Sequence, residues 1–202
     1  AARTLWAGKA VSVQTELHRH LDVSARTSTM LRLAQERGFE AASTSLEAFR
    51  DKLIIRKPMT DLSAVLAQFT LFPKVLARPE VLELVAFEVA EDCYREGTRK
   101  VELRYSPTFV TEYSKLNWDE VLDGFERGLQ RAIKTYPNLK VGMLCIASRD
   151  FGVDEVTRTT EFFLKHQRRF VGFDLAGNET QYPCRMFEGA FKALKKAKAR
   201  IT

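Results

Sequence analysis

Long apolar runs, cysteine pairs and glycine-rich phosphate loops are all missing from this sequence of 202 residues. No run approaches the roughly 20 apolar residues that a membrane-spanning helix requires, so we predict no membrane partner. The N-terminal stretch AARTLWAGKA lacks the layout of a signal peptide, and we expect a cytoplasmic protein. Neither GxGxxG nor a GxxxxGKS-type motif occurs, which removes the usual signatures of a nucleotide-phosphate site.

Cysteine and histidine are both scarce. The three cysteines, Cys93, Cys145 and Cys184, stand far apart with no CxxC spacing, which argues against a disulfide framework and a zinc finger. We interpret them as free thiols in a reducing compartment. Only three histidines occur, and two of them, His18 and His20, stand together.

The net charge is +6, but the basic residues are scattered along the chain. An anionic partner such as nucleic acid is one interpretation, and a solvated surface is the one we favour. The densest basic run, at 192–200, has alanine and leucine at the positions that face the other way. This spacing is typical of the solvated side of a helix, so we predict no nucleic-acid partner.

Short β-type runs alternate with longer helical patterns along the whole chain. Strands are predicted at 11–21, 100–106, 141–148 and 170–177. Helices are predicted at Thr27–Arg37, Ser45–Phe49, Leu62–Leu71, Pro79–Glu96, Trp118–Tyr136, 154–167 and about Cys184–Ala199. This alternation indicates βαβ units and therefore a parallel sheet.

Polar residues stand at the C-terminal ends of three of the predicted strands, where both barrels and open sheets place their chemistry. We predict an α/β fold, a (β/α)8 TIM barrel, of which about the first four β/α units plus a helical insertion are present. A complete barrel takes about 250 residues. We therefore expect residues 1–202 to be the N-terminal part of a single barrel domain, with 200–202 starting a fifth strand.

The strongest local feature is TELHRHLD, residues 15–22. Because strand side chains alternate, Glu16, His18, His20 and Asp22 are predicted to share one face. Zinc accepts imidazole nitrogens and carboxylate oxygens, so two histidines on a strand end are able to hold one ion. A catalytic zinc site needs three protein ligands plus water. His166 lies among basic residues in a helical stretch, and we interpret it as a surface residue.

Three motifs together resemble the adenosine deaminase family of metal-dependent barrel aminohydrolases. TELHRHLD is similar to its first-strand metal motif, and REGTRKVELRYSP, at 95–107, is similar to its second-strand signature. GFDLAGNE, at 172–179, resembles its fourth-strand signature. The motifs occur in the family's order and cover nearly the whole chain.

The resemblance implies roles for individual residues. His18 and His20 match two ligands of a single Zn2+ ion, Asp22 matches a residue that contacts the ribose hydroxyls, and Gly177 matches a glycine whose amide meets a purine ring nitrogen. The stretch DLSAVLAQF, at 61–69, is similar to an apolar lid helix. Its residues implied to cover the substrate are Val65, Leu66 and Phe69, which helix core packing explains equally well.

Three further residues of the motifs are interpreted as supporting the site. Arg104 is expected to be structural, holding a strand end near carboxylates, with Ser106 following it in the motif. Asp174 is expected either to orient a metal-bound histidine or to cap a loop amide. The sequence departs from the family at Val23-Ser24, where members commonly have a small pair such as Gly-Ala, so the ribose side of the pocket and the substrate stay open.

The resemblance implies hydrolytic deamination of a purine nucleoside, adenosine to inosine plus ammonia, by a zinc-activated water. Alternative substrates are adenine, AMP or a modified adenine nucleotide, and a third interpretation is an inactive half-barrel binding module. The family's fifth-strand HAGE segment, with a third zinc ligand and a general-acid glutamate, and a later histidine and aspartate have no counterpart. We therefore expect the catalytic residues beyond Thr202, or on a second chain or fragment that completes the barrel.

Overall fold

Four strands form the frame of the molecule. The structure is a computed structural model and describes residues 13–202, so the first two residues of the strand predicted at 11–21 lie outside it, as does the N-terminal stretch considered above. The strands are β1 (Gln14–His20), β2 (Thr98–Tyr105), β3 (Lys140–Ser148) and β4 (Gly172–Ala176). Each of the four predicted strands is confirmed, with differences of a few residues at the ends.

In the described part of the chain, the helices pack around this frame and leave one face of the sheet free of them. The longer ones are α1 (Thr27–Glu36), α5 (Pro79–Arg95), α7 (Trp118–Thr135), α8 (Gly152–Lys165) and α9 (Glu188–Lys196). The shorter ones are α2 (Leu46–Leu53), α3 (Leu62–Ala67), α4 (Leu71–Val75) and α6 (Pro107–Thr111), with 3-10 turns η1 (Leu21–Val23), η2 (Arg149–Phe151), η3 (Gln167–Arg169) and η4 (Cys184–Phe187). Within residues 13–202, no helix combines the length and apolar character needed to cross a membrane.

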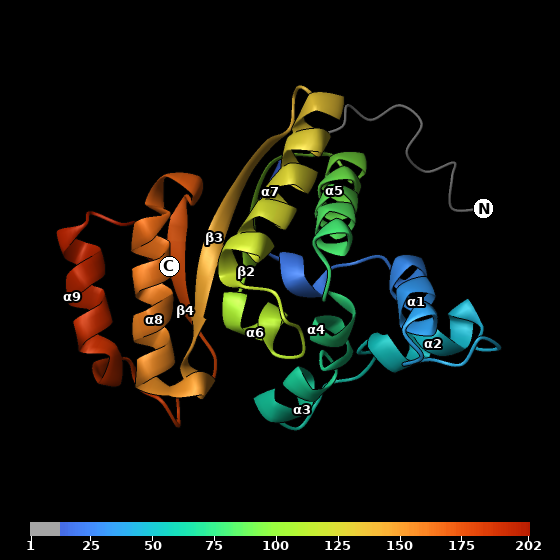
Figure 1. Cartoon of the computed structure of the whole chain (residues 1–202), viewed down its shortest axis with the longest axis horizontal. Helices are drawn as coiled ribbons and strands as arrows, with labels where there is room; N and C mark the ends of the chain where they lie inside the picture. The colour runs from blue at the N-terminus through green and yellow to red at the C-terminus, as the bar shows by residue number, and fades with distance from the viewer. Residues whose placement is uncertain (1–12) are drawn as a thin grey trace.

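One predicted helix is divided in the structure. The pattern over Leu62–Leu71 predicts a single helix, but a turn at residues 68–70 separates α3 from α4. Pro73 lies inside α4, and its missing amide proton would leave a continuous helix without one of its hydrogen bonds. The division places α3 and α4 in separate positions, with α3 at the end of the molecule where the strands end (Figure 1).

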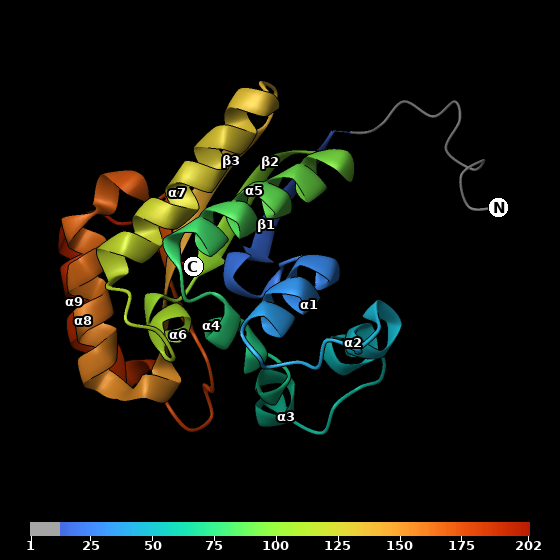
Figure 2. The same ribbon diagram turned by 45° about the vertical axis from the view of Figure 1, so that its right-hand side comes forward.

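The sheet is parallel, and each strand lies next to its successor in the order β1-β2-β3-β4. A doubly wound sheet would reverse its strand order at a switch point, and this one does not. Helices α5, α7 and α8 line the same side of the sheet (Figures 1 and 2). Ile201 forms a parallel bridge with Phe173, so a fifth strand begins as predicted. The arrangement is the wall of a (β/α)8 barrel over about half its circumference.

The face of the sheet beneath the helices, called the outer face here, carries the hydrophobic core. Its buried side chains are Val101, Leu103, Tyr105, Met143, Cys145, Ala147, Phe173 and Leu175. Cys93 and Cys145 are buried and Cys184 is exposed, and all three are free thiols as predicted. Burial raises the pKa of the Cys93 thiol to about 11, which makes it unreactive.

Helices α5 and α7 touch each other at backbone distance. A Cβ atom added to Gly128 of α7 would lie 2.2 Å from the carbonyl oxygen of Glu83 in α5. Since even an alanine would not fit there, the absence of a side chain at Gly128 sets how closely the two helices pack.

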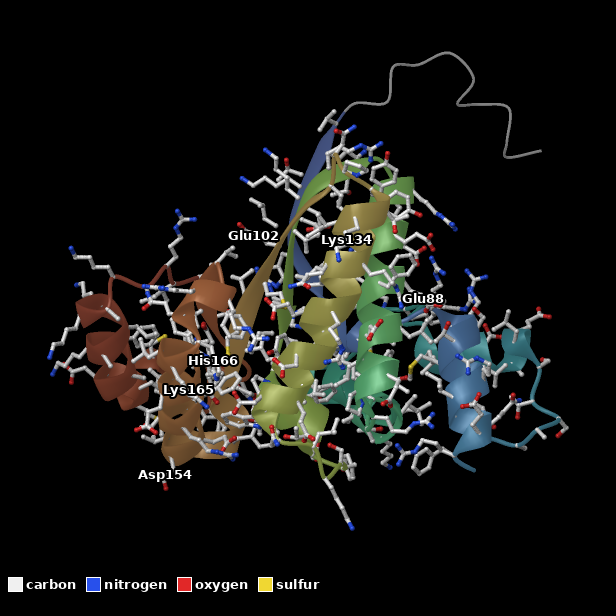
Figure 3. The ribbon with its side chains drawn as sticks, turned by 45° about the horizontal axis from the view of Figure 1, so that its top comes forward. Glu88, Glu102, Lys134, Asp154, Lys165 and His166 are labelled. Atoms are coloured by element: carbon white, nitrogen blue, oxygen red, sulfur yellow. The ribbon has the colours of Figure 1, made fainter. Side chains whose placement is uncertain are left out.

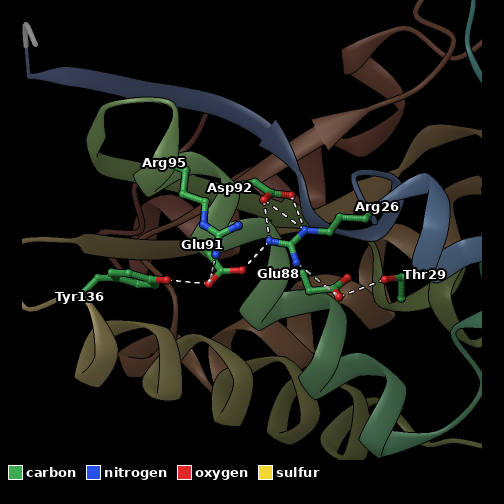
Figure 4. A network of polar contacts seen from close by, with 7 residues as sticks. All are labelled: Arg26, Thr29, Glu88, Glu91, Asp92, Arg95 and Tyr136. Atoms are coloured by element: carbon green, nitrogen blue, oxygen red, sulfur yellow. Dashed lines mark hydrogen bonds and ion pairs between the residues drawn. The ribbon is translucent and has the colours of Figure 1, made fainter. Parts of the chain in front are cut away.

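A charged network joins these two helices to the start of α1. The Arg26 guanidinium donates to Asp92 at 2.6 Å and to Glu91 at 2.5 Å, both on α5 (Figure 4). The Tyr136 hydroxyl, just after α7, donates to Glu91 at 2.6 Å. The Tyr136 hydrogen bond, with help from Arg26, lowers the pKa of the Glu91 carboxyl below its ordinary value of 4.5. The segment that follows β1 is therefore fixed to the outer helices.

Candidate functional site

The two histidines of β1 lie side by side where that strand ends. Their ring centroids are 5.6 Å apart, with the ring planes tilted by 35°. His20 pairs in register with Arg104 of β2, which places it on the inner face, opposite the helices. Rings this close are able to direct nitrogen lone pairs at one ion.

The predicted row of four alternating side chains is interrupted on both sides of the histidines. A register shift occurs between Glu16 and Arg19, and Glu16 pairs with Val101, which belongs to the outer-face core. The strand also ends at His20, so Asp22 lies in the turn η1 instead of the strand. The expectation of one shared face was therefore wrong for Glu16 and Asp22, because strict alternation holds only within an unbroken strand.

Asp22 is buried between the ends of β1 and β2, with 3% of its surface exposed. Its Oδ2 accepts a hydrogen bond from the backbone N–H of Ser106 at 2.9 Å, and its Oδ1 lies 3.6 Å from His20 Nδ1. Within residues 13–202, that Oδ1 is buried without a hydrogen-bond partner. Ser106 itself caps α6, since its Oγ accepts from the Phe109 N–H at 3.3 Å. One carboxylate oxygen thus joins two strand ends, and the other is left facing His20.

Arg104 and Asp174 form a buried ion pair across the inner face. Nη1 of Arg104 donates to Oδ2 of Asp174 at 2.6 Å, and the two residues are 3% and 8% exposed. Nη2 donates to the carbonyl oxygen of Leu17 at 2.8 Å. A buried, well-paired guanidinium needs this kind of geometry to offset its lost hydration. Arg104 therefore ties β4 to the backbone of β1 immediately before His18.

The surroundings of His18 favour its neutral form. Partial burial lowers the pKa of the His18 imidazole, and the positive charge of Arg104 acts in the same direction. A neutral imidazole has a free lone pair for a metal ion. Over residues 13–202, however, no three His, Cys, Asp or Glu side chains are grouped so as to hold a metal. The described chain fits zinc with two imidazoles and no complete ligand set.

His166 was predicted to lie on the surface and is instead largely covered. Its side chain is 13% exposed, its Nε2 lies 2.7 Å from Asp119 Oδ1, and its ring packs 4.8 Å from that of Phe162. In Figure 3 it lies by α8 on the side that faces α7. The Phe162 ring, one helical turn before it, accounts for the burial, and His166 belongs to the helix layer instead of the inner face.

The three apolar residues assigned to a lid come from α3 and the turn after it. Leu66 is 43% exposed, whereas Val65 is half-buried and Phe69 packs against Phe72 with ring centroids 6.2 Å apart. The same helix borders a cleft of about 440 Å³ formed with residues 54–60. Phe69 thus packs against the hydrophobic core, and of the three residues only Leu66 has a side chain exposed enough to contact a ligand.

Gly177 follows β4 with a φ of 107°, a backbone conformation that favours glycine. A Cβ atom there would lie 2.1 Å from Oδ2 of Asp150, so the space is already filled by a carboxylate. Sequence reasoning assigned no role to Asp150 or to the neighbouring Arg149, which is 3% exposed and bonds to the segment after Gly177. The sequence does contain a signal for these two residues, because Arg149 and Asp150 are charged and directly follow the buried strand β3.

The fold and these residues define a class before any relative is considered: half of a (β/α)8 hydrolase-type barrel with histidines at the end of its first strand. The family model described as "Adenosine deaminase" matches residues 14–202. This chain therefore belongs to the adenosine deaminase family.

One curated relative agrees with that assignment, and two solved structures share the fold. Adenosine deaminase of Klebsiella pneumoniae is 31% identical over 188 residues, which are 93% of this chain and 56% of that protein. A zinc-bound amidohydrolase from Burkholderia ambifaria superposes with a TM-score of 0.80 at 22% identity, over 98% of this chain and 55% of that one. The N6-methyl-AMP deaminase of Arabidopsis thaliana does so with a TM-score of 0.73 at 24% identity, over 94% and 56%. The chain spans about half the length of the relatives it matches.

Proposed function

We propose that this chain supplies the first half of the active site of a zinc-dependent enzyme that deaminates adenosine to inosine and ammonia. The observation that carries the proposal is the pair of neighbouring imidazoles of His18 and His20, 5.6 Å apart at the end of β1. The 31% identity to an adenosine deaminase over 93% of the chain supports the choice of substrate.

His18 and His20 would hold the metal, and their surroundings support that role. The bound zinc of the Burkholderia ambifaria relative is in keeping with it. Zinc, when bound, lowers the pKa of a water ligand and so supplies a nucleophile near neutral pH. Arg104 and Asp174 hold the strand backbone behind the two rings, and Asp22 faces His20 with its unpaired oxygen.

The substrate would lie between the strand ends and α3. In this proposal the Gly177 amide meets a purine ring nitrogen, Asp22 anchors the sugar, and the exposed Leu66 covers the ring with Val65. Asp22 is 3% exposed and its Oδ1, which lacks a partner within the described part of the chain, is itself buried, so contact with a sugar hydroxyl would require the ends of β1 and β2 to part when the ligand binds.

The remaining catalytic groups would come from outside residues 1–202. The family resemblance implies a third histidine ligand, a proton-donating glutamate and a zinc-binding aspartate in segments that follow this one. Because the chain covers 56% of its Klebsiella relative, a complete enzyme has room for them. We expect them either on the same polypeptide or on a second chain that closes the barrel.

A different aminopurine is the second candidate. The fold is shared with an N6-methyl-AMP deaminase, and Val23-Ser24 alters the implied ribose side of the pocket. Incubating the complete protein with adenosine, adenine, AMP and N6-methyl-AMP, and following the products by chromatography, separates these substrates. Turnover of none of them would favour a binding module, which should hold zinc weakly.

The metal assignment is tested by replacing one histidine at a time in the complete protein. We expect His18→Ala to lower bound zinc by at least about tenfold, because each catalytic zinc depends on three protein ligands. His166→Ala is the matched control and should keep its zinc. Elemental analysis after dialysis gives the metal content, and undiminished zinc in His18→Ala would overturn the ligand assignment.

A further inference from the structure

Arg149 is a buried cation for which the proposed chemistry has no use. It is the first residue of η2, directly after β3, and 3% of its surface is exposed. Removing a guanidinium from water is costly unless its donors are paired, so its partners indicate what it is there to hold.

All of the side-chain hydrogen bonds that Arg149 makes with described residues go to one segment, at 175–184. Nη2 donates to the carbonyl oxygen of Leu175 at 3.2 Å and to Oε1 of Glu179 at 2.6 Å. Nη1 donates to the carbonyl oxygen of Tyr182 at 3.2 Å and to Sγ of Cys184 at 3.3 Å. The guanidinium thus spans the whole turn that follows β4. A lysine has neither the fork nor the number of donors to do so.

Asp150 holds the beginning of the same segment. Its carboxylate accepts the backbone N–H of Asn178 at 3.3 Å and the hydroxyl of Ser148 at 3.2 Å. Gly177 packs directly against it, leaving no space for a Cβ atom. Two consecutive side chains at the end of β3 therefore fix the end of β4 and its turn at several points.

We propose that Arg149 is a positioning residue that sets where the Gly177 backbone meets the ring of the bound aminopurine. This inference rests on the proposed function, because only a ligand at Gly177 gives the position of that backbone a chemical meaning. Arg149 touches no reacting atom. It acts by holding the turn at 175–184 through a rigid fork, so that the amide is in place before the ligand arrives.

The holding role is tested without any substrate by hydrogen exchange and mass spectrometry. In Arg149→Met we expect the amides of 177–184 to exchange about tenfold faster, the effect of losing charged hydrogen bonds. Peptides from β3 and α8 should not change. Arg185→Met is the matched control: Arg185 lies one residue after the segment, is exposed, and its side chain makes no hydrogen bond or ion pair with the described residues. Equal exchange in Arg149→Met and the parent would overturn the proposal.

A milder variant protects this test against misfolding. The Glu179 side chain is 73% exposed, so Glu179→Gln removes an ionic partner of Arg149 without disturbing the core. We expect faster exchange over 177–184 in the same direction but smaller than in Arg149→Met. If Arg149→Met does not fold, as judged by circular dichroism, Glu179→Gln decides the result: unchanged exchange there would overturn the proposal.

Kinetics of the complete enzyme test the connection to the ligand. For Arg149→Met we expect a roughly 10- to 100-fold loss in kcat/KM, carried mainly by KM, with bound zinc unchanged. Arg149→Lys should recover part of the loss. Replacing ring nitrogens by carbon in a purine inhibitor should weaken binding less in Arg149→Met than in the parent, which a general loss of stability would not produce. An unchanged KM alongside faster exchange would overturn the positioning role, whereas a parent protein inactive on every aminopurine would overturn the proposed function.

Discussion

The two faces of the sheet differ in composition and in burial. The outer face is apolar and covered by α5, α7 and α8, with Leu103, Cys145 and Phe173 almost entirely buried. The inner face carries charge, with the Arg104–Asp174 ion pair lying beside an exposed His18. The contrast shows that, within residues 13–202, the outer face is a complete apolar core for its four strands, while the inner face carries the residues proposed for the site without a complete metal ligand set.

The largest effect should come from the outer face. Phe173→Ala deletes a ring that is 1% exposed and packs against Phe163 at 5.4 Å between centroids. We expect a loss of about 3–5 kcal/mol in the free energy of unfolding, since the cavity adds to the lost hydrophobic burial. Urea denaturation measures it. Val153→Ala, at a position 43% exposed on α8, should change stability by less than about 0.5 kcal/mol. If Phe173→Ala and Val153→Ala lowered the free energy of unfolding by similar amounts, the outer face of the sheet would not be the main source of stability.

The inner face should be almost as sensitive, for an electrostatic reason. Asp174→Asn leaves the Arg104 guanidinium buried without its counter-charge, and we expect a loss of about 3 kcal/mol. The double replacement Arg104→Met with Asp174→Leu should regain most of that stability, because no charge is then left unpaired. Chemical denaturation of the three proteins gives both numbers. An Asn variant as stable as the parent would mean that water, and not Asp174, compensates Arg104.

The smallest effect should lie in the charged network outside the sheet, and it should depend on pH. Glu91 has a pKa lowered by the Tyr136 hydroxyl and by Arg26, so its contribution is present above its ordinary pKa of 4.5 and is lost as the pH falls through the lowered folded-state value. Tyr136→Phe should therefore cost about 1 kcal/mol near neutral pH and less at about pH 3. Unfolding measured at both pH values checks this.

A matched control for that experiment is Tyr94→Phe. Tyr94 stacks on Tyr136 with ring centroids 4.4 Å apart, and its hydroxyl has no hydrogen bond to the described residues. Its replacement should leave the pH dependence unchanged. If Tyr136→Phe lowered the free energy of unfolding by the same amount at both pH values, the hydrogen bond to the charged Glu91 would not be the cause of the loss.

Most of the fold was predictable from the sequence because periodicity reports burial directly. The near-continuous apolar run at 141–148 is β3, and the spacing from Pro79 onward is α5. The predictions failed where local patterns compete with tertiary contacts. The register shift after Glu16, for example, arises only when β1 pairs with β2. The division of α3 from α4 has a local cause, Pro73, which lies two residues beyond the predicted end of that helix.

Within the candidate site, only residues that belong to a recognisable sequence motif were predicted. His18 and His20 were found because two side chains of a type that binds metals stand in one short strand. Arg149 was missed because its partners are 26 to 35 residues away in sequence and include backbone oxygens, which no side-chain pattern reveals. Asp22 was placed on the strand because alternation says nothing about where a strand ends.

The contact at Gly128 has a consequence for how much this chain is able to vary. Where two helices are separated by side chains, each change of residue size moves one helix relative to the other. At Gly128 the main chains of α5 and α7 are in contact, so the distance between the two helices is set by the backbone. Neighbouring side chains only occupy the space that this contact leaves. Substitutions elsewhere between α5 and α7 then leave the spacing of the two helices unchanged, and with it the support beneath the sheet whose first strand bears both His18 and His20.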